Sequence, residues 1–405
     1  MFRFLRNASN RALGRQAVHG GRRGPGIGGS RDAESRSGKL AEAEVAYRDD
    51  AETLREIVWD PIVTRSGEAE IALVVPDGAL HMINFAALPQ GGGYVADSAL
   101  AIHFLLAERD LARERDLDAG NVGVLAVGAP EFDAAPKAQA MTGHTAERSA
   151  ADGTEPLRAV DARCPDDPAL RFEPIPASKD EVARIARLVR NGGGTATTLL
   201  GVESDEATVK AAVRGKRGLH LATHTYFLDP ECVDGRPRRE PLSSHGEWAS
   251  SRVPVRRSLS PLLFSGLALA GANRADERSE GHGGEDGMLM AAEIASLDLR
   301  GLEWVVLSGC ETGLGELQPQ EGVMGLERAF TVAGASTVVT SLWKVRDEFT
   351  ARWMEQFYRA RLEDGATVPR AVWEAQRGML SWLRSTGRST HPFYWGAFVS
   401  SGDWR

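Results

Sequence analysis

Short apolar runs alternate with amphipathic stretches from about residue 66 to the last residues of the chain. Each run is apolar throughout, with no alternation, and is too brief for a helix, so both faces of the predicted strand are covered. This pattern predicts an α/β fold with a mostly parallel central sheet and helices on both faces. The predicted strands span residues 71–75, 122–127, 219–222, 304–307, 337–340 and 394–399.

Helices are predicted between these strands, where apolar residues recur at helical spacing. Ser178, followed three positions later by Glu181, predicts a capping box at the start of one of them. The predicted helices span residues 40–58, 179–189, 204–214, 289–297, 323–332, 349–362 and 368–383.

The chain divides into three parts. Residues 1–39 hold nine Lys or Arg against two acids and are predicted to form a disordered basic tail. A lead-in helix is predicted over 40–65, and a single domain over 66–405, with an N-terminal α/β half (66–170) and a catalytic half (171–405). Three stretches exceed the usual loop length and are expected to be functional loops or disordered insertions, at about 131–170, 228–260 and 274–287.

The composition of the chain excludes several classes of function. With 42% hydrophobic and 26% charged residues, the 405-residue chain is ordinary for a globular protein. Its net charge of −8, from 48 basic and 56 acidic residues, argues against nucleic acid as a partner. No apolar run approaches the ~18 residues of a membrane span. The three cysteines fit neither a zinc site nor a disulfide framework, so we expect a cytoplasmic protein with no metal or cofactor.

Two candidate catalytic side chains follow predicted strands. His224 comes directly after the strand at 219–222, and Cys310 comes just after the strand at 304–307. Catalytic groups of an open parallel sheet gather beyond the carboxyl ends of its strands. If these two strands are neighbours, an imidazole and a thiol meet there, as nucleophilic thiol catalysis requires. Glycines beside Cys310 would let backbone N–H groups point at a developing oxyanion.

Other interpretations of these residues remain open. A lone cysteine after an apolar run is usually a buried small hydrophobe, and a lone histidine at a strand end is usually structural. Two ligands with no evident third and fourth would make a poor zinc site. The sequence has no Gly-x-Ser-x-Gly elbow, Walker loop or dinucleotide fingerprint, so serine hydrolase and nucleotide-binding activities lack support.

At these residues the sequence resembles the CHAT family of caspase-like cysteine peptidases, relatives of separase and the caspases. The resemblance covers roughly residues 66–403 and is carried by stretches in family order. These are VPDGALH and FAALP within 75–89, LLG at 199–201, HLATH at 220–224, SGLALAGAN at 265–273, LSGCETGLG at 307–315, GASTVVTSLWKVRD at 334–347 and HPFYWGAF at 391–398.

The resemblance implies a caspase-like three-layer fold, extended by the N-terminal α/β half, that carries a His–Cys dyad. His224 would be the base and Cys310 the nucleophile, and the backbone N–H groups of Thr225 and Cys310 would form the oxyanion hole. Family members usually have glycine where this chain has Thr225, and a β-branched residue cannot easily adopt a positive φ. Either the backbone is extended there and its N–H still points inward, or the oxyanion hole is impaired.

Substrate preference is expected to depend on the strand that follows the cysteine-bearing strand and its helix. Ser341, Trp343 and Asp347 are the candidate substrate-binding residues of this segment. An acid at Asp347 would favour Arg or Lys before the cleaved bond through a charge-assisted contact. A solvated or helix-capping Asp347 is the alternative.

The resemblance further implies a regulated bacterial effector that cleaves a protein or peptide, such as a gasdermin-like pore-forming partner. The long insertions at 228–260 and 274–287 lead us to expect that activity stays low until a partner protein or a ligand orders the cleft. If the preference is for a basic residue, arginines in the 228–260 insertion offer sites of self-cleavage. Neither nucleic acid nor a membrane is expected as a partner. Two rivals remain: a CHAT-fold scaffold that binds peptides or partner proteins with little or no catalysis, and thiol chemistry on a non-peptide acyl group.

Several further residues have expected roles. His220 is expected to make a core hydrogen bond, and His391 and Trp395 to pack in the core. Glu293 is expected to be an exposed helical acid, and Glu311 either to order the loop after Cys310 or to be solvated.

Overall fold

The structure is a computed structural model, and it describes residues 31–64, 69–112, 121–135, 171–227, 261–274, 285–309, 319–343 and 345–405. The central sheet has eight strands: β1 Ile71–Val74, β4 Ala101–Phe104, β5 Val124–Pro130, β6 Ala196–Gly201, β7 Gly218–Ala222, β11 Trp304–Leu307, β12 Thr337–Ser341 and β13 Phe398–Gly402. Their spatial order is β1-β4-β13-β12-β11-β7-β5-β6. Every neighbouring pair is parallel except β12 with β13. The predicted mostly parallel α/β sheet is therefore confirmed.

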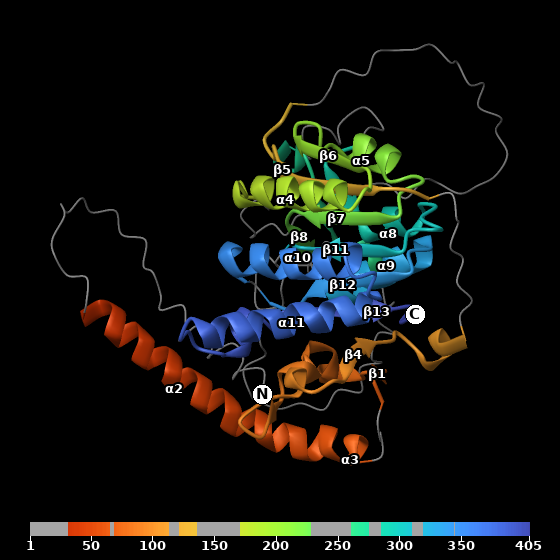
Figure 1. Ribbon diagram of the computed structural model, residues 1–405. Coiled ribbons are helices and arrows are strands. Elements are labelled where there is room, and N and C mark those ends of the chain that lie inside the picture. Colours follow the sequence, from red (N-terminus) through yellow and green to blue (C-terminus); the bar gives the residue numbers. More distant parts are fainter. Residues whose placement is uncertain are drawn as a thin grey trace, which may run out of the picture.

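Helices cover both faces of this sheet (Figure 1). Alternate residues of β11 show why its run is apolar throughout. Trp304 and Val306 pack into the core under one set of helices, and Val305 and Leu307 into the core under the other. The first set is α4 Ala177–Asn191, α10 Asp347–Leu362 and α11 Val368–Ser385, and the second is α5 Glu206–Ala212, α8 Ala291–Ala295 and α9 Pro319–Ala333.

Two small antiparallel sheets were not predicted, and neither were β4 and β6 of the central sheet. β8 Thr225–Phe227, β9 Ser265–Ala268 and β10 Met288–Met290 form a sheet in the order β10-β9-β8, and β2 Pro89–Gln90 pairs with β3 Gly93–Tyr94. Short 3-10 turns lie at Gly78–Met82, Phe85–Ala87, Val95–Asp97, Glu108–Ala112, Pro261–Leu263, Ala272–Arg274 and Pro392–Tyr394.

The N-terminal helical segment is longer than predicted. It comprises α2 Arg31–Leu54, a π-helical turn at Arg55–Trp59 and α3 Asp60–Val63, so residues 31–39 are helical where the sequence predicted a tail. Alanine, glutamate and arginine in that stretch are good helix formers. In Figure 1 the segment lies at the end of the molecule that carries β1 and β4. None of the described helices, α2 included, has the length and apolarity that a membrane crossing demands.

The last strand and the division into halves differ in detail from the sequence prediction. The last strand begins at Phe398 instead of residue 394, because Pro392 opens a turn from which the Trp395 indole donates to Thr390 O at 2.9 Å and packs in the core. The two proposed halves are also not separate in the sheet. β5 comes from the first half of the sequence but lies between β7 and β6, on the far side of the sheet from β1 and β4.

Candidate active site

The strand that leads to His224 and the strand that leads to Cys310 are neighbours. β7 and β11 pair in parallel with Leu221 opposite Leu307, and the Ser308 N–H donates to Leu221 O at 2.9 Å. A Cβ placed on Gly309 would overlap the carbonyl oxygen of Thr223. The chain on its way to Cys310 therefore lies against the residue before His224. Cys310 itself, with Glu311 and most of the three long polar stretches, lies outside the described residues.

The contacts of the His224 ring include a hydrogen bond and two aromatic rings. Its Nε2 lies 2.7 Å from the carbonyl oxygen of Glu173, and the ring stacks on Phe132 and Phe172 with centroid separations of 5.3 and 5.9 Å. A carbonyl oxygen only accepts, so this bond puts the imidazole hydrogen on Nε2. In the neutral ring the lone pair is then on Nδ1.

The end of β5 and the segment before α4 place these partners. Ala129 has φ of 43°, beside a bulge at the end of β5, and its N–H donates to Ser178 Oγ at 2.7 Å. Positive φ in a non-glycine residue is strained backbone that surrounding contacts must hold. Phe132 follows this turn. Phe172 is held by the Asn273 side chain, whose Oδ1 accepts from Phe172 N at 2.7 Å and whose Nδ2 donates to Phe172 O at 3.0 Å.

The sequence predicted His224 but none of these supporting residues. A backbone carbonyl acceptor such as that of Glu173 has no sequence signature, and Phe132 and Phe172 belong to none of the quoted stretches. Asn273 does end the SGLALAGAN stretch, so that motif was the one available signal for part of the support.

Thr225 lies in extended backbone at the start of β8. It pairs with Leu267, and it is not among the described residues with positive φ. The His224 carbonyl accepts from Ala268 N at 2.9 Å. In an antiparallel pair the next residue's N–H points the other way, so the Thr225 N–H faces away from β9. Of the two alternatives for Thr225, the structure has the extended backbone.

The three candidate substrate residues follow β12, the strand beside β11. The Ser341 hydroxyl is buried and donates to Trp343 O at 2.6 Å, and the Trp343 indole N–H donates to Phe393 O at 3.3 Å. Asp347 is exposed in the first turn of α10, with no side-chain cap bond at that helix end. Ser341 and Trp343 therefore shape the turn after β12, and Asp347 is the one whose side chain faces solvent.

The predicted capping box of α4 is wrong. The helix begins at Ala177 with Pro176 as its N-cap and no side-chain cap bond. The Ser178 hydroxyl instead donates to Ile175 O at 2.7 Å while accepting from Ala129 N, and Glu181 turns toward the sheet. Ser178 therefore bonds to the end of β5, and Glu181 bonds to Ser308 after β11, in place of the predicted cap.

The remaining residues with predicted roles are mostly structural. His220 is fully buried and lies 3.2 Å from Tyr358 OH through Nδ1, which confirms its core hydrogen bond. His391 and Trp395 are buried in the core as expected. Glu293 is not simply exposed: with Glu206 and Glu285 it surrounds the Lys210 ammonium, at N···O distances of 2.6 to 3.0 Å, and these three carboxylates could hold a metal ion only by displacing that cation.

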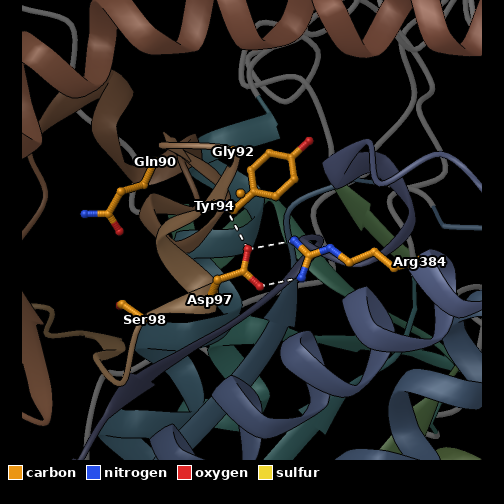
Figure 2. Close-up of a pocket in the computed structure, with 7 residues that line it drawn as sticks. Gln90, Gly92, Tyr94, Asp97, Ser98 and Arg384 are labelled. Carbon is orange, nitrogen blue, oxygen red and sulfur yellow. Dashed lines mark hydrogen bonds and ion pairs between the residues drawn. The ribbon is translucent and has the colours of Figure 1, made fainter.

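A shallow pocket of about 490 Å³ lies elsewhere, between the β2–β3 hairpin and α11 (Figure 2). Asp97 and Arg384 form a two-bond ion pair across it, with both N···O distances at 2.7 Å, and Asp97 also accepts from Tyr94 N at 2.9 Å. Its charged groups are thus used to join α11 to the N-terminal half, and none of its lining residues comes from the strand ends near His224.

Comparison with known proteins shows which family this chain belongs to. A model of the CHAT domain matches residues 48–403. Tetratricopeptide repeat protein 28 of Homo sapiens is 25% identical to this chain over 235 residues, which are 56% of this chain and 8% of that protein. The chain therefore spans a small fraction of the length of this relative.

Two solved structures are among the matches to this chain. The Arg-specific cysteine proteinase gingipain R has a TM-score of 0.44 and 9% identity, over 89% of this chain and 67% of that chain. The complex of the pro- and mature domains of RgpB from Porphyromonas gingivalis has a TM-score of 0.43 and 10% identity, over 91% of this chain and 71% of that chain.

Proposed function

Because this chain belongs to the CHAT domain family, we propose that it is a cysteine endopeptidase in which His224 is the base and Cys310 the nucleophile. One observation carries the proposal. β7 and β11 are adjacent and parallel, and Thr223 and Gly309 touch at their ends. The two proposed catalytic residues are each the next residue along from this contact.

The proposed reaction uses the two nitrogens of His224 differently. Nε2 keeps its hydrogen on Glu173 O, and Nδ1 takes the proton of the Cys310 thiol. The thiolate attacks the peptide carbonyl carbon, and the backbone N–H groups of Cys310 and Thr225 hold the oxyanion. The imidazolium then protonates the leaving amine as the C–N bond breaks. Water, deprotonated by Nδ1, attacks the thioester and releases the acid and the free thiol.

Asp347 is our proposed determinant of a basic residue before the cleaved bond. Its carboxylate is exposed just beyond the turn after β12, and no described residue forms an ion pair with it. The neighbouring Glu348 is already paired with Arg388 at 2.8 Å. An arginine or lysine of a substrate would find at Asp347 a carboxylate that is not committed to another cation.

The biological setting is also part of the proposal. Chemistry of this kind suits a regulated effector in the bacterial cytoplasm that cuts a partner protein, such as a gasdermin-like one, once an activating partner has bound. The alternative is a scaffold that binds peptides without cutting them, and the extended backbone at Thr225 supports the peptidase over it.

A positional-scanning peptide library tests the proposal with wild type, Cys310→Ala, His224→Ala, Asp347→Asn and Glu348→Gln. Wild type is expected to cleave after Arg or Lys, Cys310→Ala not at all, and His224→Ala at least ~100-fold more slowly. Asp347→Asn should raise KM for basic peptides about tenfold, the loss of one charge-assisted contact. Glu348→Gln is the matched control and should stay within about twofold of wild type.

Two outcomes would contradict this account. Folded wild type that binds peptides and leaves all of them intact would favour the scaffold. Equal effects of Asp347→Asn and Glu348→Gln on KM would remove Asp347 from the substrate site.

A further inference from the structure

A buried polar cluster lies directly beneath the two strand ends. It consists of Glu181 on α4, His220 on β7, Ser308 after β11 and Tyr358 on α10, and we name it the Glu181 cluster. These side chains are 9%, 0%, 8% and 0% exposed, respectively. Ser308 is two residues before Cys310, and His220 is four residues before His224.

Glu181 joins the two strands. Its Oε1 accepts from Ser308 Oγ at 2.5 Å and lies 3.0 Å from His220 Nε2, at an angle poor for a hydrogen bond. On the other side of the imidazole, Tyr358 OH lies 3.2 Å from Nδ1. Burial raises the pKa of Tyr358, so this hydroxyl stays neutral and can donate to Nδ1. The imidazole hydrogen then belongs on Nε2, facing the Glu181 carboxylate.

Fold stability alone does not explain such a cluster. A buried carboxylate is costly unless its oxygens are satisfied, and apolar residues of similar size often serve stability equally well. Glu181 lies beyond the first turn of α4 and makes no cap bond for its own helix. Its carboxylate instead accepts from Ser308, the last described side chain before Cys310.

The same short segment also holds His224. Residues 172–181 contribute the Phe172 ring and the Glu173 carbonyl to the imidazole, and Glu181 to Ser308. Ser178 ties the segment to the strained end of β5 through Ala129 N. A single piece of chain therefore contacts both strand ends and sets one relative to the other.

We propose that Glu181 is a positioning residue for the nucleophile: through Ser308 it fixes the end of β11, the strand that leads to Cys310, relative to the end of β7, the strand that leads to His224. This inference rests on the proposed function. Displacement of a reacting group by about 1 Å can lower a rate by about 100-fold. Loss of the single buried bond between Ser308 and Glu181 can therefore have a large effect on the catalytic rate.

The test compares Glu181→Ala, Ser308→Ala, their double variant and Glu181→Gln in the full chain. Each single alanine variant should lower kcat by about 10- to 100-fold with KM within twofold of wild type. Because both act through one bond, the double variant should lose no more than the worse single. Glu181→Gln keeps an oxygen that can accept from Ser308 and should restore kcat to within about threefold.

Two controls separate positioning from loss of stability. Ser400→Ala removes a buried hydroxyl that bonds His103 at 2.8 Å, and Arg184→Gln changes an exposed residue of α4. Ser400→Ala should lower Tm as Ser308→Ala does but leave kcat unchanged. The second readout is the iodoacetamide reaction rate of Cys310, followed by mass spectrometry of its peptide, which should fall at least fivefold in both alanine variants and in neither control.

Unchanged kcat and alkylation in Ser308→Ala, multiplied losses in the double variant, or no rescue by Glu181→Gln would each overturn the inference. If Glu181→Ala fails to fold, Ser308→Ala and Glu181→Gln still test whether Glu181 acts through Ser308. The alkylation rate can be measured whether or not peptides are cleaved. Failure of the proposed function therefore shows as an inactive wild type, and failure of this inference as variants whose thiol reacts like that of wild type.

Discussion

At the scale of single residues, the backbone conformation of Thr225 decides whether the absence of glycine after His224 impairs the proposed oxyanion hole. A glycine after the histidine would be required only if that position needed positive φ. Here the residue is extended and paired with Leu267, a conformation that a β-branched side chain favours. Threonine at this position is therefore compatible with a working oxyanion hole.

Thr225→Gly should accordingly bring no gain in activity. We expect kcat/KM to stay within about threefold of wild type, and stability to fall by about 0.5–1 kcal/mol because glycine weakens a strand. Steady-state peptide hydrolysis and chemical denaturation measure the two effects. A tenfold rise in kcat/KM would show that Thr225 does impair the site.

At the residue level, the sequence predicted position where the strand pattern is clear. His224 lies just beyond the end of β7, as the pattern predicted, and its catalytic role stays a prediction. Glu181 was assigned to a helix cap because local spacing fits a capping box, whereas its true partner, Ser308, is distant in sequence. Long-range partners of this kind are decided by packing and leave no local pattern.

At the scale of elements, one buried acid joins α9 to the sheet. Glu327 is 7% exposed, and its Oε1 accepts from Thr340 Oγ1 of β12 at 2.8 Å. Burial raises the pKa of Glu327 to about 7, and the hydrogen bond from Thr340 only partly offsets this effect. The carboxyl group is therefore protonated in the folded protein over a range where it is ionised in the unfolded chain.

This predicts a pH-dependent difference between wild type and Glu327→Gln. Between the ordinary pKa of 4.5 and the folded value of about 7, the folded state binds the extra proton, so its stability falls as pH rises. Relative to the glutamine variant, wild type should lose roughly 3 kcal/mol from pH 4.5 to 7 and change little below pH 4.5. Denaturant unfolding of both proteins at several pH values gives this difference directly.

The exposed Glu355, paired with Arg359 at 2.9 Å, supplies the matched control. Glu355→Gln should show the pH dependence of wild type. Parallel stability curves for wild type and Glu327→Gln would mean that the Glu327 carboxyl is not protonated in the fold.

Long amphipathic helices and continuous apolar strands were predictable from the sequence, whereas the strands of the small sheets were not. The apolar runs of β1, β7, β11 and β12 and the helices α10 and α11 lie within a few residues of their predicted positions. β8, β9 and β10 have three or four residues each and exist because they pair with one another, and β4 and β6 of the central sheet were not predicted either. The residue after His224 owes its conformation to this unpredicted sheet.

At the scale of the whole molecule, strand order is what brings the site together. The sequence predicted β7 and β11 but not that they are neighbours, because order depends on how the crossover helices pack on both faces. The CHAT resemblance supplied that step, and the parallel pairing of the two strands agrees with it. The segment 172–181 then acts as a common support for both strand ends.

The most direct test of the His–Cys claim is labelling with a peptidyl electrophile, with each cysteine quantified by mass spectrometry in wild type and His224→Ala. Cys164 and Cys232 serve as internal references. The account predicts that Cys310 of wild type reacts at least ~100-fold faster than the other two and that this advantage disappears in His224→Ala. Equal labelling of all three thiols, or a fast Cys310 in His224→Ala, would contradict the claim that His224 and Cys310 act as one catalytic pair.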